Sequence, residues 1–435
     1  MDYHRPLNES RDHPKVHIAL VMLPGRNNVN SKEFSTSPLL LNPGGPGSSG
    51  VFFVLRMGLR LQKILGTDQD IIGFDPRGIG FTIPRADCWS TPSPSKRHHE
   101  DTLRGFFHRT EWNLMGIDIG IINSSNMALK LLDARRRAVA KLCKEKDNLL
   151  GSASILRYAA TPHVARDMLS IVDAWDAWRD SLVLKLASTH VKSLYPQEVQ
   201  LTSMPALPTN TNSTKGKLSY WGFSYGTFLG TTFASMFPDR VGRMILDGVI
   251  DADQYVNSIW ESSLHDTDKV LEQFFRYCYQ TGDQCQLYRL GDQPTDIQQR
   301  FNLVMENLQK KPVTLVDPTR FVPVMITASE IKRMLFGSLY LPIASFPVIA
   351  LVLNLIYENK ADALGPLLML GGELQDYCSP GLPASYLPDD ASIANMCGDK
   401  RYPVRQVRSP IFILNQCSPN RIPDERDDLR AAVEL

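Results

Sequence analysis

The glycine-rich turn around Ser224 constrains the fold of this 435-residue chain more than any other stretch. Residues 222–226 read GFSYG, a G-x-S-x-G pattern, with a strand pattern (KLSYW) before it and a helix pattern (GTFLGTTFASMF) after it. A strand pattern at 241–250 follows, which completes the strand, helix and strand of a right-handed crossover unit in a parallel sheet. Such a tight turn predicts a strained backbone at Ser224, flanked by glycines where a Cβ would collide with the adjoining strand or helix.

Short apolar strand patterns at 16–23, 37–41 and 70–74 precede this unit, and the last two run into the loops NPGGPGSSG and DPRGIG. Because nearly all their residues are apolar, they predict a sheet that is covered on both faces. In the first loop, residues 44–47 leave backbone N–H groups uncovered by side chains. This arrangement suits either the binding of an oxyanion or a tight turn without a ligand.

The polar residues of the neighbouring loops favour structural roles. Asp75 and Arg77, two residues apart beside a strand end, are expected to tie down a turn, because carboxylate–guanidinium pairing is a frequent structural device. His163, near the start of a predicted helix, and His98 and His99, in a polar loop, are expected to be ordinary surface or capping residues.

The rest of the chain divides by its patterns. TPHVARDMLSIVDAWDAW predicts a helix that begins at Thr161 and has one apolar face, formed by Val164, Met168, Ile171 and Trp175. Residues 179–217 are rich in Pro, Thr, Asn and Ser, which indicates a surface insertion. The sequence therefore predicts a core over 1–250, an inserted helical cap over 251–405, and a return to the core over 406–435 that begins with the strand pattern SPIFILN at 409–415.

Composition excludes some partners. With 47 Lys and Arg against 46 Asp and Glu, the net charge of +1 gives no reason to expect nucleic acid or an anionic membrane as a partner. The longest apolar run, 339–357, contains two prolines and a central serine, so we expect a helix pair inside the cap and not a membrane span. The polar start of the chain lacks the apolar region of a signal peptide.

The seven cysteines lack a C-x-x-C spacing, and their odd number leaves at least one thiol unpaired. In an oxidising compartment we expect Cys278 to pair with Cys285 and Cys378 with Cys397, because each pair is close in sequence, and Cys417 to stay free. Sequons for N-glycosylation occur at three asparagines and would matter only in an exported protein: Asn8, Asn123 and Asn212.

The motifs NPGGPG, DPRGIG and GFSYG, in this order, resemble those of the α/β-hydrolases of the proline iminopeptidase and tripeptidyl-aminopeptidase-like group, particularly its fungal members. The similarity extends over most of the chain and includes the ARDML helix and FPDRVGRMILDGV after the serine. It implies an α/β-hydrolase fold with a helical cap, and a serine aminopeptidase that needs no metal or organic cofactor.

The resemblance also assigns roles. Ser224 would be the nucleophile that forms an acyl-enzyme, and the backbone N–H groups of Gly45 and Tyr225 would bind the oxyanion. The substrate would be a peptide or a small acyl compound, and a secreted or vacuolar location is plausible for such a protein. Three acidic residues of the cap region are candidate partners for a substrate amine: Glu261, Asp268 and Glu330. The oligomeric state stays open.

The acid and the histidine of the catalytic triad are the places where the sequence departs from the family. In this fold the acid and then the histidine follow the serine along the chain, but only His265 lies beyond Ser224, at the start of the cap region. Where related enzymes have an N-x-x-D-P pattern, residues 415–419 read NQCSP, with Ser418 in place of the aspartate. Asp251 or Asp253 could substitute as the acid, whereas the acidic residues of the charged tail (Asp424, Asp427 and Asp428) no longer resemble the family.

These departures predict a chain that lacks the last strand and the histidine loop of the fold. We therefore expect impaired catalysis, either because the chain is incomplete at its ends or because it is a non-catalytic relative that acts by binding. An esterase or lipase is the alternative within the enzyme class.

Overall fold

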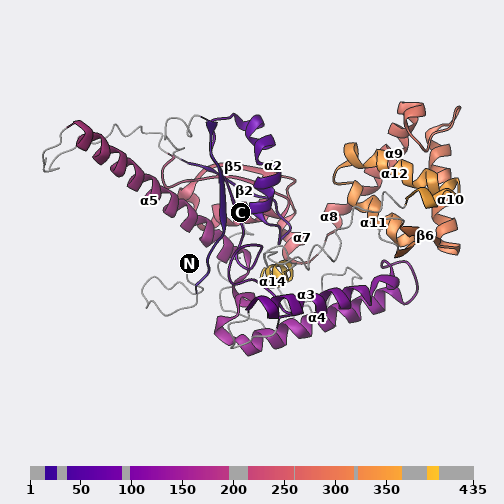
Figure 1. The fold of residues 1–435 in the computed structure, drawn as a ribbon, viewed down its shortest axis with the longest axis horizontal. Coiled ribbons are helices and arrows are strands. Elements are labelled where there is room, and N and C mark those ends of the chain that lie inside the picture. Colours follow the sequence, from indigo (N-terminus) through magenta and orange to yellow (C-terminus); the bar gives the residue numbers. More distant parts are fainter. Residues whose placement is uncertain are drawn as a thin grey trace. The chain divides into compact units, whose positions relative to one another are not determined.

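The computed structural model describes residues 15–26, 37–90, 98–194, 214–258, 260–317, 322–364 and 389–400. These residues form two compact units, and Figure 1 labels their elements where there is room. The first unit comprises the described residues up to Thr110, those from 136 to 258, and those from 389 to 400. The second comprises Glu111–Arg135 and the described residues between 260 and 364.

The first unit contains a five-stranded sheet in the order β1-β3-β2-β4-β5. Its strands are β1 (Leu20–Leu23), β2 (Leu39–Asn42), β3 (Ile71–Phe74), β4 (Leu218–Phe223) and β5 (Val241–Asp247). The edge strand β1 runs antiparallel to β3, and the other neighbours are parallel, with Leu41 opposite both Gly73 and Trp221. This mixed, largely parallel sheet is compatible with the predicted α/β class. The crossover from β4 through α6 (Tyr225–Met236) to β5 is confirmed.

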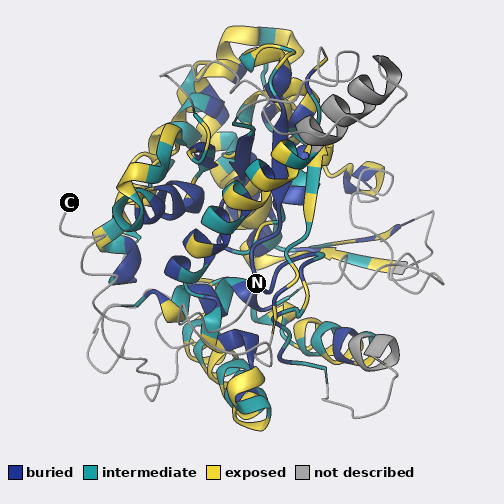
Figure 2. Cartoon of the chain, turned by 90° about the vertical axis from the view of Figure 1, so that its left-hand side faces the viewer, coloured by how far each residue is buried: buried dark blue, intermediate teal, exposed yellow. Residues whose placement is uncertain are grey.

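Helices cover both faces of this sheet, as the apolar strands predicted. Every residue of β2 and β3 is buried. Leu39, Leu41 and Ile71 form a core cluster with residues of α2 (Gly50–Leu65). On the opposite face, Leu40 and Ile72 line a small cavity together with Ile171 and Trp175 of α5 (Thr161–Leu194). Figure 2 shows the resulting alternation of buried and exposed residues along the helices.

The helix α5 is longer than its apolar pattern predicted. Its predicted core face is confirmed, since Val164, Met168, Ile171 and Trp175 are at most 8% exposed. However, the helix continues to Leu194, so the expected insertion at 179–217 begins as regular helix, and the rest of it, 195–213, lies outside the described residues. The stretch after Arg179 contains Leu, Lys and Ala (SLVLKLAS), which are good helix formers and favour the continuation of the helix.

The remaining helices of the first unit are shorter or lead out of it. α3 (His98–Leu114) continues from the first unit into the second, and α4 (Ala128–Leu150) returns from the second unit to the first. α7 (Ala252–Val256) follows β5, and α14 (Ala391–Gly398) brings the chain back to this unit. The strand pattern at 409–415 lies outside the described residues.

The second unit is mostly helical, with an apolar core that includes Phe274, Ile297 and Leu353. Its helices are α8 (Glu261–Leu264), α9 (Thr267–Thr281), α10 (Pro294–Lys310), α11 (Ala328–Ser338) and α12 (Pro342–Tyr357). It also contains an antiparallel hairpin of β6 (Val313–Asp317) and β7 (Val322–Ile326), which the helical patterns around it concealed.

The predicted helix pair at 339–357 is wrong, because this apolar run forms the single helix α12, which accommodates Pro347 in its interior. None of the helices in the described part of the chain is long and apolar enough to cross a membrane.

Candidate active site

Ser224 lies on the turn between β4 and α6, at the carboxyl ends of the parallel strands, and its side chain is exposed. Its φ of 53° and ψ of −122° are unusual for a residue with a side chain, which confirms the predicted strain. The Ser224 N–H donates to the Asp247 carbonyl (2.9 Å), and the Ser224 carbonyl accepts from the Thr227 N–H (2.9 Å) and hydroxyl (2.7 Å). Because β5 and α6 hold the residue from both sides, the surrounding fold maintains this conformation.

Two glycines allow the backbone segments around Ser224 to approach closely. A Cβ on Gly222 would lie 2.4 Å from the Gly226 carbonyl oxygen. Gly44, which has a φ of +91°, lies directly against the turn: a Cβ there would lie 2.3 Å from the Phe223 carbonyl oxygen and 3.0 Å from the Tyr225 nitrogen. The NPGGPG loop therefore meets the Ser224 turn at Gly44.

The two loops contain backbone N–H groups with different partners. The Gly44 N–H donates to the Asn42 side-chain oxygen (2.9 Å), so it is already occupied. Tyr225 is the first residue of α6, where an N–H has no acceptor within the helix. Within the described part of the chain, the Gly45 N–H makes no hydrogen bond. Among the described residues, the two N–H groups predicted to bind an oxyanion, those of Gly45 and Tyr225, therefore have no hydrogen-bond partner.

Replacing Gly44 by alanine should lower the free energy of unfolding by about 2–4 kcal/mol, because backbone strain adds to a collision with the Phe223 carbonyl. Gly66→Ala is the matched control, since Gly66 has a similar φ (+105°) but nothing within 4 Å of the added Cβ. It should cost only the strain, about 1–2 kcal/mol. Urea unfolding measures both. Equal losses in the two variants would contradict the close approach of the loop and the turn.

The Tyr225 side chain points away from the turn into a buried polar network that the sequence did not predict. Its hydroxyl is hydrogen-bonded to the Thr161 hydroxyl and to the Asn395 side-chain nitrogen (2.9 Å). The Asp399 carboxylate accepts from the Thr161 hydroxyl (2.6 Å), the Thr161 N–H (2.7 Å) and the Tyr255 hydroxyl (3.0 Å). The network thus joins four helix ends or short helices, and no local motif marks residues so far apart in the sequence.

Burial dominates the electrostatics of this network. It raises the pKa of the Asp399 carboxyl to about 6, although the hydrogen bonds from Thr161 and Tyr255 act in the opposite direction. Burial, followed by the nearby Asp399 charge, also raises the pKa of the Tyr225 phenol, which therefore stays protonated and can donate.

Asp75 and Arg77 have structural contacts, as predicted, but they do not pair with each other. Asp75 accepts hydrogen bonds from the N–H groups of Val51 (3.0 Å) and Phe81 (2.8 Å). Arg77 forms a bidentate pair with Asp167 of α5, at 2.7 Å and 2.6 Å, and both side chains are at most 3% exposed. Asp167 is 90 residues away in sequence, which is why the pattern around Arg77 could not identify it.

The candidates for the remaining catalytic roles are dispersed. His265 is 77% exposed and lies 3.1 Å from Asp266, in the second unit. Asp251 caps α7 by accepting the Gln254 N–H (3.0 Å), and Asp253 is exposed within that helix. The charged tail and residues 415–419 lie outside the described residues.

The three amine-partner candidates belong to the second unit. Glu261 and Asp268 are exposed. Glu330 takes part in the capping box at the start of α11 and pairs with Arg333 (2.8 Å).

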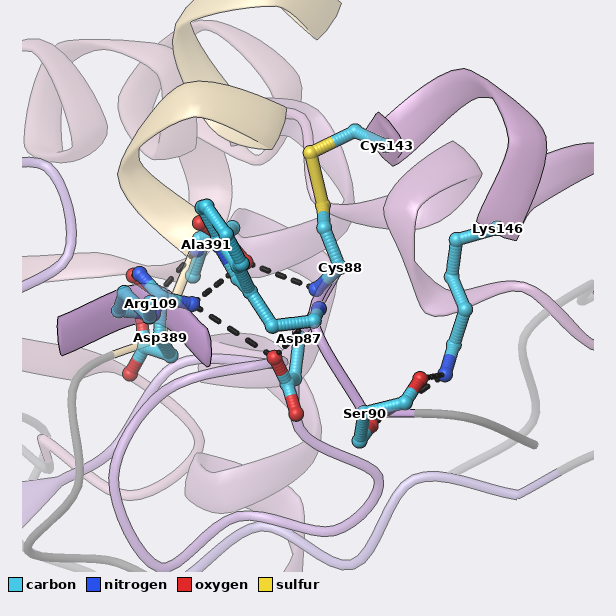
Figure 3. Close-up of a disulfide and its surroundings, with 10 residues drawn as sticks. Asp87, Cys88, Ser90, Arg109, Cys143, Lys146, Asp389 and Ala391 are labelled. Atoms are coloured by element: carbon cyan, nitrogen blue, oxygen red, sulfur yellow. Dashed lines mark hydrogen bonds and ion pairs between the residues drawn. A yellow bond between two sulfur atoms is a disulfide. The ribbon is translucent and has the colours of Figure 1, made fainter. Parts of the chain in front are cut away.

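Where both cysteines lie among the described residues, one predicted and one unpredicted disulfide form. Cys278–Cys285 is confirmed, and Cys88–Cys143 was missed because the two residues are 55 apart in sequence. Figure 3 shows the Cys88–Cys143 bridge beside Asp87, Arg109 and Asp389. Cys397 is disulfide-bonded, while Cys378 and Cys417 lie outside the described residues.

The Cys88–Cys143 bridge also bears on metal binding. Among the described residues, its two sulfurs and the Asp390 carboxylate are the only potential metal ligands that cluster, and the disulfide occupies both sulfurs.

Comparison with known proteins finds no matching family model. The chain is 25% identical over 318 residues to the tripeptidyl aminopeptidase of Streptomyces coelicolor, which covers 72% of this chain and 45% of that protein. It is 27% identical over 257 residues to serine protease Hip1 of Mycobacterium tuberculosis, which covers 58% and 34% respectively. A segment of 54 residues, 12% of the chain, is 46% identical to carboxylesterase B of the same species and covers 10% of it.

The chain thus spans less than half the length of these relatives. An exposed serine on a strained strand-to-helix turn agrees with the name of the serine protease among them. Together these similarities support a family of serine peptidases and hydrolases for this chain.

Proposed function

We propose that this chain is a serine hydrolase of the α/β-hydrolase fold that removes N-terminal residues or short peptides through an acyl-enzyme on Ser224. The observation that carries the proposal is the turn itself: an exposed hydroxyl, held in a strained conformation, beside the unoccupied N–H of Tyr225. The distant relatives named as a tripeptidyl aminopeptidase and a serine protease favour peptides as substrates.

In the proposed reaction, the Ser224 oxygen attacks the carbonyl carbon of the substrate. The carbonyl oxygen becomes an oxyanion, which the N–H groups of Tyr225 and Gly45 would stabilise as charge develops. Collapse of this intermediate breaks the C–N bond and leaves an ester on Ser224, and the proton lost by the Ser224 hydroxyl ends on the amine that departs. Water then hydrolyses the ester and releases the acid. The second unit is our candidate for the cap that would bind the free amine of the substrate.

We further propose that these 435 residues alone turn over slowly. The only histidine after Ser224 is His265, which is highly exposed. Loss of the histidine from a serine triad costs roughly 10⁶ in kcat. A binding role for the hydrolase fold is therefore the second candidate function. The local similarity to a carboxylesterase supports an ester substrate as a third.

The substrate class can be tested with p-nitrophenyl esters of alanine that carry either a free or an acetylated amine, with p-nitrophenyl acetate for comparison. We expect faster release of p-nitrophenol from the free-amine ester by at least about tenfold, because an aminopeptidase uses the amine for binding and orientation. Added imidazole should raise the rate if the base is missing, and Ser224→Ala corrects for the reaction of imidazole itself. Equal rates for all three esters would favour an esterase, and no Ser224-dependent release would favour a binding protein.

A further inference from the structure

The buried network behind Tyr225 links the candidate active site to a carboxylate. It lies within the first unit and joins the starts of α5 and α6, the short helix α7 and the end of α14. Asp399 follows the last residue of α14 and accepts the N–H of Thr161, the first residue of α5. A carboxylate is favourable at the positive end of α5, and this bond satisfies one of the N–H groups that a helix start leaves free.

The ionised carboxylate fixes the direction of every hydrogen bond in the chain that leads to Tyr225. Because it can only accept, the Thr161 hydroxyl must donate to it (2.6 Å). The Thr161 oxygen is then an acceptor for the Tyr225 hydroxyl, and the Tyr225 oxygen accepts in turn from the Asn395 side-chain nitrogen (2.9 Å). Each polar atom in this series of hydrogen bonds has a partner. A buried network whose polar atoms are all paired specifies one arrangement of its members.

Tyr225 is also the residue whose backbone N–H lies next to Ser224. Its ring is 3% exposed, and its hydroxyl is anchored at the far end of the side chain. The anchored ring therefore limits how the first turn of α6 can rotate, and with it the direction of the Tyr225 N–H. A hydrogen-bond donor stabilises an oxyanion only when it points at the place where the charge develops.

We infer that Asp399 is a positioning residue: acting through the Thr161 and Tyr225 hydroxyls, it orients the backbone N–H of Tyr225 toward the oxyanion. This inference rests on the proposed role of Ser224. Asparagine at position 399 would place an N–H₂ group against the Thr161 and Tyr255 hydroxyls that now donate to it, so the bond to Thr161, and with it the bond between Thr161 and Tyr225, would have to reverse. The substrate would still bind, but the donor would be misaligned in the reacting complex.

The test measures how fast a fluorophosphonate probe modifies Ser224 in the 435-residue chain with imidazole present. The Ser224 oxygen bonds to phosphorus, fluoride leaves, and the hydroxyl proton goes to imidazole. The concentration dependence of labelling separates probe binding (KI) from the chemical step (kinact). We expect Asp399→Asn to lower kinact about tenfold with KI unchanged, since misplacement of catalytic groups affects the reacting complex most.

Two further variants separate positioning from a general loss of structure. Tyr225→Phe should lower kinact by a similar factor, and the double variant by no more than either single one, because both substitutions break the same chain of bonds. Thr161→Ser keeps the hydroxyl and should have nearly the wild-type kinact. Thr161→Val removes the hydroxyl and should lower kinact as much as Asp399→Asn does. If Asp399→Asn fails to fold, the comparison of Thr161→Ser with Thr161→Val still tests the inference.

Asp70→Asn is the matched control, because Asp70 is fully buried, accepts a backbone N–H (Gly25, 2.8 Å) and precedes β3 at the opposite ends of the parallel strands. It should leave kinact unchanged. Wild-type labelling at Ser224 with the same kinact in Asp399→Asn and Thr161→Val would overturn the inference alone. Failure of the wild-type chain to react at Ser224 would reject the proposed function, and the inference with it.

Discussion

Replacing Asp167 by alanine should lower the free energy of unfolding by about 3–5 kcal/mol. Asp167 and Arg77 pair through two hydrogen bonds of 2.7 Å and 2.6 Å and are almost fully buried. Removal of the carboxylate would leave the Arg77 guanidinium buried without its counter-charge, although its bond to the Tyr158 carbonyl (3.2 Å) would remain. Urea unfolding followed by circular dichroism measures the loss.

The exposed pair Lys215–Asp180 is the control for this prediction. Its charged atoms are as close, at 2.7 Å, but the side chains are 47% and 51% exposed. Asp180→Ala should therefore change stability by less than about 1 kcal/mol, since water already solvates both charges. A second variant that replaces both Arg77 and Asp167 by apolar residues should lose less than Asp167→Ala, because no charge is left unpaired. If Asp167→Ala and Asp180→Ala were equally stable, the buried pair would not hold α5 to the loop after β3.

Replacing Cys88 and Cys143 by serine should lower the stability of the first unit by about 4 kcal/mol. The bridge closes a loop of 55 residues, and the entropy that it removes from the unfolded chain grows with the length of the loop. The loop leaves the first unit after Thr110 of α3 and returns at Arg136 of α4, so the bridge joins the parts of the first unit that precede and follow the segment 111–135.

The Cys278–Cys285 bridge provides the comparison, because it closes only seven residues and lies in the second unit. Its removal should cost about 2 kcal/mol on the same basis. Hydrogen exchange resolved by peptide should assign the first loss to the first unit and the second loss to the second unit. The ordering would be refuted by a larger loss from the shorter loop.

The sequence predicted those parts of the fold that local chemistry determines. The apolar strands β2 and β3, the turn at Ser224 and the core face of α5 each follow from residue types at short spacing. The hairpin of β6 and β7 was missed, since two five-residue strands within a helical region give only a short pattern. The continuation of α5 to Leu194 was missed because residues 179–217, taken together, are rich in Pro, Thr, Asn and Ser, which indicated an insertion.

The candidate site also contains residues that the sequence could identify and residues that it could not. Ser224, Gly45 and Tyr225 could be named from motifs, because the G-x-S-x-G turn and the glycine loop depend on neighbouring residues. Asp399 could not, since its partner Thr161 is 238 residues away and aspartate, threonine and tyrosine in a helical context usually lie at the surface. The same holds for the pairing of Arg77 with Asp167. Buried polar contacts of this kind require the fold to bring distant residues together.

The central claim is that Ser224 is the nucleophile, and the most direct measurement is peptide mapping of the chain after reaction with a fluorophosphonate probe in the presence of imidazole. The strained, exposed position of Ser224, beside a Tyr225 N–H that has no acceptor among the described residues, predicts one phosphonyl group per chain, on the peptide that contains Ser224. Ser224→Ala should remain unmodified, and its stability should match that of the wild type. Equal modification of the two chains, or a wild-type adduct on another residue, would contradict the account.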